Sequence, residues 1–103
     1  MANFNSLNIP PPAIEKGGNE LMRVAVANDG ELYMSIRRGF DDPEGWGRVL
    51  AEVAKHVSQI YATETKYNKA DAAQRILEAF AKDMAAGAPG SPVTGANSSG
   101  ANS

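Results

Sequence analysis

The stretch LMRVAVANDGELYMSIR, residues 21–37, decides the fold. Apolar and polar side chains alternate on both sides of Asn28-Asp29-Gly30, which is typical of two half-buried strands joined by a tight turn. A two-residue turn would mix the two faces, whereas a three-residue loop puts all the alternating apolar side chains on one face. These are Met22, Val24, Val26, Leu32, Met34 and Ile36. The sequence therefore predicts a β-hairpin with a three-residue loop and Gly30 in a left-handed conformation.

An amphipathic helix is predicted from Trp46 to Tyr61. Asp41 or Asp42 can cap it, and Pro43 suits the first helical position because its missing N–H would have no partner there. Its apolar residues form a stripe about 120° wide, the width expected of a helix packed on a sheet. They are Trp46, Val49, Leu50, Val53, Val57, Ile60 and Tyr61.

Two glycines flank the tryptophan at the start of this helix. Gly45 and Gly47 each cost a helix about 1 kcal/mol relative to alanine. A phosphate could be admitted by such glycines, but the carboxylates just upstream would repel it. We expect instead that a neighbouring backbone approaches the helix closely at this point.

A second amphipathic helix is predicted from Ala70 to Met84. Asn68 is placed to cap it, Asp71 supplies an acidic first turn, and Gly87 is a C-terminal stop. Residues 87–103 consist of small and polar residues with one valine. Such a segment cannot bury enough apolar surface to offset its ordering entropy, and we predict a disordered tail.

Residues 1–19 form an arm ahead of the domain. Its prolines, Pro10-Pro11-Pro12, remove three backbone donors and favour an extended polyproline II conformation. Two interpretations stay open: the arm lies over the domain with Leu7 or Ile9 docked, or the proline run is a ligand for an aromatic groove. Residues 20–86 are predicted to form one two-layer α+β domain, with the antiparallel hairpin packed against the two helices.

Composition excludes several classes of function. The chain has no cysteine, which rules out disulfides, iron–sulfur clusters, thiolate zinc sites and cysteine nucleophiles. The formal net charge of −2 argues against nucleic acids and anionic membranes as partners. Neither a secretory signal nor a bilayer-spanning apolar run is present, so we expect a cytoplasmic protein. No cofactor and no metal are predicted.

One candidate binding site lies on the polar face of the hairpin. Arg23, Tyr33, Ser35 and Arg37 share this face, with Arg38 adjacent. Two arginines beside an aromatic ring could bind a carboxylate, a phosphate or single-stranded nucleic acid. A solvated strand face would have the same composition.

A carboxylate cluster, Asp41, Asp42 and Glu44, could in principle hold a divalent cation. Its spacing is not that of a calcium loop, and acidic residues belong at a helix N-terminus. We therefore interpret the cluster as helix capping.

His56, the only histidine, follows Glu52 by one helical turn. Such a pair could orient an imidazole as a general base. Pairs of this spacing are also ordinary on helix flanks, and no nucleophile accompanies this one. We expect a structural histidine at the rim of the core, beside Glu52.

Three segments, read in order, resemble a known family. They are Leu7-x-Ile9-Pro10-Pro11, Leu21-Met22-Arg23-Val24, and Pro43…Trp46-Gly47-x-x-Leu50-Ala51-x-x-x-Lys55-His56. Over about residues 7–85 the chain resembles the small bacterial proteins grouped as domain of unknown function 5076. The resemblance implies a short cytoplasmic bacterial protein without an assigned activity, and it supplies no catalytic residues.

Three functions are consistent with these features. The first is a non-catalytic, self-associating interaction module, the second a binder of small anions on the arginine face, and the third an enzyme using Glu52 and His56. A small domain with open strand edges favours the first. We expect a two-fold homodimer, formed by edge pairing of hairpins or by burial of helix surface.

Overall fold

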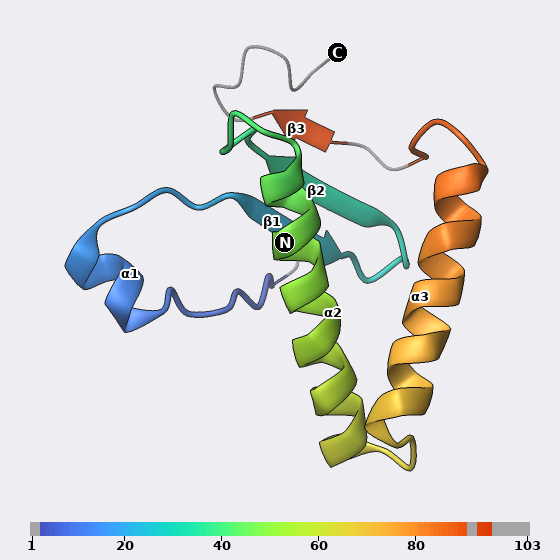
Figure 1. Cartoon of the computed structure of the whole chain (residues 1–103). Coiled ribbons are helices and arrows are strands. Elements are labelled where there is room, and N and C mark those ends of the chain that lie inside the picture. The colour runs from blue at the N-terminus through green and yellow to red at the C-terminus, as the bar shows by residue number, and fades with distance from the viewer. Residues whose placement is uncertain (1–2, 91–92, 96–103) are drawn as a thin grey trace. The chain divides into compact units, whose positions relative to one another are not determined.

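The helices and strands follow one another in the order α1-β1-β2-α2-α3-β3 in the computed structural model, which describes residues 3–90 and 93–95 (Figure 1). This is an α+β fold, as predicted. The chain forms two units, residues 1–39 with 92–103 and residues 40–91, and each is described by itself. The packing of the hairpin on the helices stays a prediction. No helix among the described residues has both the length and the apolar character that a bilayer span requires.

The hairpin of the first unit has the predicted register. β1 (Met22–Val26) and β2 (Leu32–Ile36) are antiparallel, with Val24 opposite Met34 and Val26 opposite Leu32. The Gly30 N–H donates to the carbonyl of Ala27 at 2.9 Å, and Gly30 has a φ of 90°. Both the three-residue loop and the left-handed glycine are therefore confirmed.

A third strand, β3 (Val93–Gly95), pairs in parallel with the outer edge of β2. It falls in the segment predicted to be disordered, and the structure departs from that prediction at these three residues. Residues 91–92 and 96–103 of the predicted tail lie outside the described part of the chain. The edge of β2 offers backbone N–H and C=O groups, and pairing with them needs no apolar side chains.

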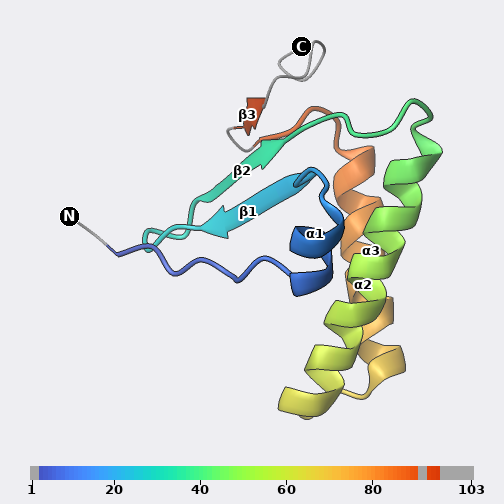
Figure 2. The same ribbon diagram turned by 90° about the vertical axis from the view of Figure 1, so that its left-hand side faces the viewer.

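The arm ahead of β1 is not extended throughout. Pro10 has polyproline II dihedrals, with φ −59° and ψ 130°, but a short helix, α1 (Pro11–Lys16), follows directly (Figure 2). Prolines fit the first turn of a helix because its N–H groups have no intrahelical partner. The prediction of an extended run is therefore wrong for Pro11 and Pro12. The helix ends at Gly17, which has a φ of 75°.

In the second unit, α2 (Glu44–Glu64) begins as its sequence predicts. Pro43 already has helical dihedrals, and a carboxylate oxygen of Asp42 accepts from the Glu44 N–H at 2.9 Å. Asp42 is therefore the cap. The helix extends beyond Tyr61 by almost one turn.

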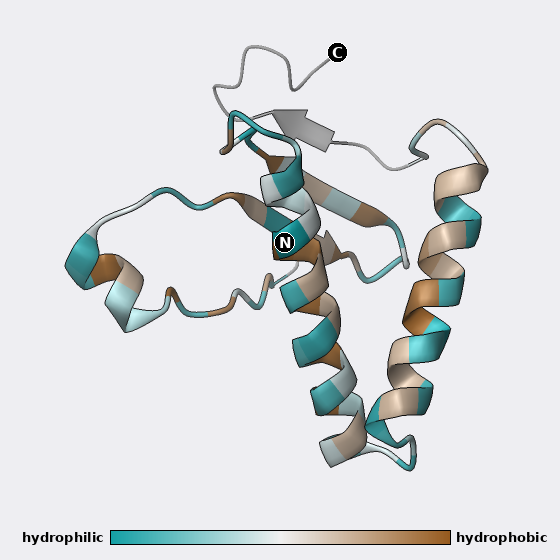
Figure 3. Cartoon of the chain, viewed as in Figure 1, coloured by the Kyte–Doolittle hydropathy of each residue, from teal (hydrophilic) through white to brown (hydrophobic). Residues whose placement is uncertain are grey.

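The second predicted helix is also confirmed, as α3 (Lys69–Ala85). The Asn68 side chain accepts from the Asp71 N–H at 2.8 Å and donates to the Asp71 carboxylate at 3.1 Å. Gly87 follows the helix with a φ of 107°. α2 and α3 contact each other and are joined by a short turn, and both carry apolar residues along their length (Figure 3).

The structure explains the glycine that precedes Trp46 differently from the prediction. Gly45 is buried, and a Cβ placed there would lie 2.5 Å from Cγ of the Phe40 ring. Phe40 in turn meets Trp46 edge to face, with ring centroids 6.1 Å apart. A side chain, not a neighbouring backbone, makes the close approach. At Gly47 a Cβ would meet nothing within 4 Å.

Candidate functional site

The predicted anion-binding face brings three of its four residues together. Arg23 lies directly opposite Ser35, and the Arg37 N–H extends the ladder by donating to the carbonyl of Leu21 at 3.0 Å. These three residues border a hollow of about 50 Å³. Tyr33 lies opposite Ala25 and is not part of this hollow.

One of the two arginines on this face already forms an ion pair. The guanidinium of Arg23 donates to both carboxylate oxygens of Glu20, at 3.0 and 3.3 Å. Glu20 also borders the hollow, and its negative charge would oppose a bound anion. By contrast, Nε of Arg37 is buried and has no hydrogen-bond partner among the described residues. The anion site stays a prediction, centred on Arg37 rather than Arg23.

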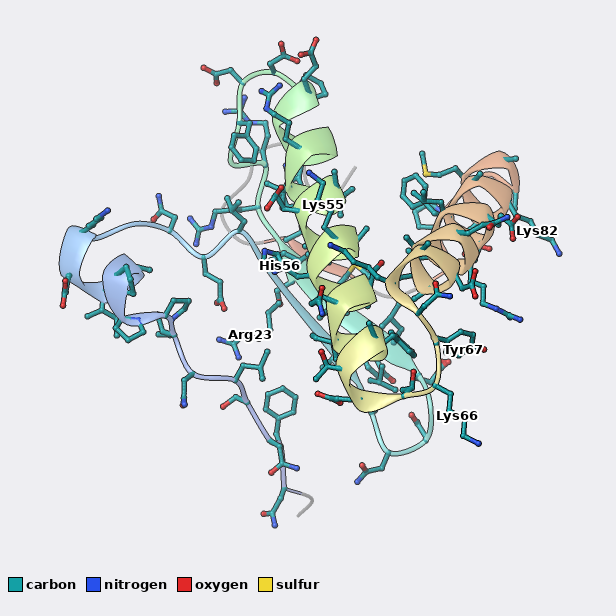
Figure 4. The ribbon with its side chains drawn as sticks, turned by 60° about the horizontal axis from the view of Figure 1, so that its bottom comes forward. Arg23, Lys55, His56, Lys66, Tyr67 and Lys82 are labelled. Carbon is teal, nitrogen blue, oxygen red and sulfur yellow. The ribbon has the colours of Figure 1, made fainter. Side chains whose placement is uncertain are left out.

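His56 lies on α2 (Figure 4), one turn after Glu52. Nε2 of His56 is 3.7 Å from a carboxylate oxygen of Glu52, and the other oxygen is 3.3 Å from Nζ of Lys55. The His56 side chain is 80% exposed. Its place beside Glu52 is as predicted, but its place at the rim of a core is wrong. The ring lies beside Glu52 on an exposed side of α2, so its side chain is mostly solvated.

Two carboxylates at the start of α2 form interactions that stabilise the helix. Asp42 caps it, and Glu44 pairs with Arg48 one turn later at 3.6 Å. In the described residues, no group of three acidic or histidine side chains is arranged to hold a metal ion.

A site that sequence reasoning missed lies between α2 and α3, near the turn that joins them. We call it the tyrosine groove. It is a hollow of about 270 Å³ lined by Tyr61, Tyr67, Ala72, Arg75, Ile76 and Ala79. The two tyrosine rings are nearly perpendicular, with centroids 6.0 Å apart, and both are partly exposed. The Arg75 guanidinium lies over the face of Tyr67, 5.3 Å from its centroid.

The end of α2 positions these rings. The N–H and hydroxyl of Thr65 both donate to the carbonyl of Tyr61, at 2.9 and 2.6 Å. The same hydroxyl accepts from the Tyr67 N–H at 3.1 Å. Thr65 thus ends the helix and turns Tyr67 back toward Tyr61. In the sequence, the signal for this groove is a pair of tyrosines that flank a short inter-helix turn, with Arg75 two helical turns beyond it.

The arm offers a second exposed feature. Its four large apolar side chains are at the surface: Phe4 is 63% exposed, Leu7 91%, Ile9 59% and Ile14 65%. A hollow of about 770 Å³ separates the arm from β1. Within its own unit, therefore, the arm does not pack Leu7 or Ile9 closely on the hairpin, and docking of the arm on the domain stays a prediction. Proline lacks the N–H that pairing with the edge of β1 would need, so Pro10 to Pro12 cannot hold the arm against the strand.

Comparison with known proteins gives three findings. Residues 6–87 match the model of a family described as Domain of unknown function (DUF5076). No curated protein matches the chain. A solved structure from the photosynthetic bacterium Rhodopseudomonas palustrus CGA009, described as a "putative pyruvate dehydrogenase", is similar with a TM-score of 0.72 and 30% identity. The similarity covers 88% of this chain and 94% of that one. The chain belongs to the DUF5076 family.

Proposed function

We propose that the protein is a small, non-catalytic interaction module that self-associates as a two-fold homodimer. The observation that carries the proposal is the arm, whose four large apolar side chains are all more than half exposed. Burying a large apolar side chain contributes about 1.5–3 kcal/mol relative to leaving it in water. An arm that leaves such side chains uncovered is stabilised by docking on another chain.

A second candidate is a small-anion site at Arg37. The buried Nε without a partner among the described residues favours it, because a carboxylate would satisfy that donor. The adjoining hollow of about 50 Å³ suits a group no larger than a carboxylate. Titration with acetate, followed by the NMR shift of the Arg37 Nε–H, tests it. No saturable shift, or an equal shift at Arg23, contradicts the site.

Enzymatic proposals find less support. The description of the Rhodopseudomonas structure would suggest an oxidoreductase, but that description names no residues that could be matched in this chain. The acid–base pair Glu52–His56 is open to water, with side-chain exposures of 62% and 80%. Water in such a setting competes for every hydrogen bond that would orient the imidazole.

Sedimentation equilibrium at tens of micromolar tests self-association. We expect a mass about twice the 10.9 kDa of the chain. A mass near 10.9 kDa at every concentration would refute the proposed function.

A further inference from the structure

The tyrosine groove has the chemistry of a receptor for a proline-containing segment. Its two rings stand nearly perpendicular, 80° apart, beside a floor of Ala72, Ile76 and Ala79. Aromatic-lined grooves bind extended proline-rich segments because the segment is preformed and loses little entropy on docking. Tyrosine adds a hydroxyl that can donate to a peptide carbonyl. At about 270 Å³ the hollow suits a few side chains rather than a whole cofactor.

The chain itself carries a short segment of this kind, which ends at Pro10 because Pro11 and Pro12 are helical. Leu7, Ile9 and Pro10 lie on the arm, and Pro10 has the dihedrals of polyproline II. Leu7 is 91% exposed. An apolar side chain followed by a proline is the kind of ligand that a groove of two tyrosines accommodates.

The groove and the arm also carry opposite charges. Arg75 stands at the groove over Tyr67 and makes no ion pair with any residue the structure describes. Glu15, on α1, is the acidic residue of the arm. Docking of the arm would bring this carboxylate toward Arg75, which would help to fix the direction of the segment.

We propose, on the basis of the self-association proposed above, that the arm of each copy docks in the tyrosine groove of the other. Gly17 and Gly18 join the arm to β1, and both have the positive φ values open to glycine, 75° and 159°. The arm already stands away from β1 across the hollow of about 770 Å³. Reciprocal exchange of two arms makes two equivalent junctions and closes the assembly at two chains.

Complementation between two variants tests this exchange. The arm variant Leu7→Ser/Ile9→Ser keeps an intact groove, and the groove variant Tyr67→Ala keeps an intact arm. We expect each alone to dimerise at least about tenfold more weakly than the natural chain. An equal mixture should dimerise more tightly than either, because one junction of the mixed dimer is intact. Tyr33→Ala, which removes a similarly exposed tyrosine outside the groove, is the matched control and should change nothing.

The outcomes separate the two proposals. If the natural chain is a monomer, self-association fails. If it is a dimer and Tyr67→Ala dimerises equally well, self-association stands and the groove is not its site. If both variants weaken the dimer but the mixture recovers nothing, the arm does not cross between copies.

A second measurement needs no variant. Lys16 lies at the end of α1, and Lys66 precedes Tyr67 at the groove (Figure 4). Lysine cross-linking of an equal mixture of unlabelled and ¹⁵N-labelled natural chain should give Lys16–Lys66 cross-links, half of them joining a light peptide to a heavy one. Cross-links of one isotope only would show that each arm binds its own chain and would overturn the exchange.

Discussion

Replacing Gly45 by alanine has two opposing effects on stability, one through helix propensity and one through packing. Alanine is favoured over glycine in a helix by about 1 kcal/mol, so propensity alone predicts a stabler protein. The new Cβ, however, would lie 2.5, 2.8 and 2.9 Å from three atoms of the Phe40 ring. Carbon atoms pack best about 3.5–4.0 Å apart, and the ring would have to move by about 1 Å.

The packing cost exceeds the propensity gain. Overfilling a packed site typically costs about 1–3 kcal/mol. Moving the Phe40 ring also disturbs its edge-to-face contact with Trp46, and such contacts contribute about 0.5–1.5 kcal/mol. After the gain in propensity is subtracted, Gly45→Ala should lower the free energy of unfolding by about 0.5–3.5 kcal/mol. For a domain of this size, each 1 kcal/mol lowers Tm by about 4–8 °C.

Urea unfolding followed by the fluorescence of Trp46, the only tryptophan, measures this change. Gly47→Ala is the matched control on the same helix, because its Cβ would meet nothing within 4 Å. It should raise stability by up to about 1 kcal/mol. In a Phe40→Ala background the clash is removed, and Gly45→Ala should become stabilising. A Gly45→Ala variant as stable as the natural chain would refute the reasoning.

Three further predictions follow from the hairpin, the α3 cap and the exposed histidine. Gly30→Val should lower stability by about 1–2 kcal/mol in urea unfolding, because a β-branched residue tolerates a φ of 90° poorly; Gly30→Asn should cost clearly less. Asn68→Ala removes the acceptor of the Asp71 N–H and should cost about 1 kcal/mol, seen as a lower Tm; Asn68→Ser should retain most of it. His56→Gln should change the free energy of unfolding by no more than about 0.5 kcal/mol, and a larger loss would mean that the pair with Glu52 is structural after all.

The parts of the fold that local rules govern could be read from the sequence. The hairpin register followed from alternation, since a shift of one residue would turn every apolar side chain to the other face. The caps at Asp42 and Asn68 followed from residue type and spacing, because a cap acts within one helical turn. These features depend on contacts only a few residues apart along the chain.

The parts that failed depend on contacts the sequence pattern does not encode. β3 is held by backbone pairing to β2, which is compatible with almost any side chains. The close approach at Gly45 comes from the Phe40 ring, whose direction depends on the course of the loop before α2. The tyrosine groove requires that Tyr61 and Tyr67 meet across a turn, which the hydrogen bonds of Thr65 shape. The candidate site was therefore much less predictable than the fold.

The pairing of β3 with β2 also limits how this sheet can polymerise. The strand order is β1-β2-β3, so among the described residues β2 has a neighbour on both sides and the β1 edge stays open. A sheet with two long, open edges can add chains without end, as amyloid fibrils do. Here β3 shields the β2 edge, and it is only three residues long, too short to template a further strand well. Growth through the β1 edge would join two sheets and then stop, so the pairing of β3 with β2 would limit open-ended growth of this sheet.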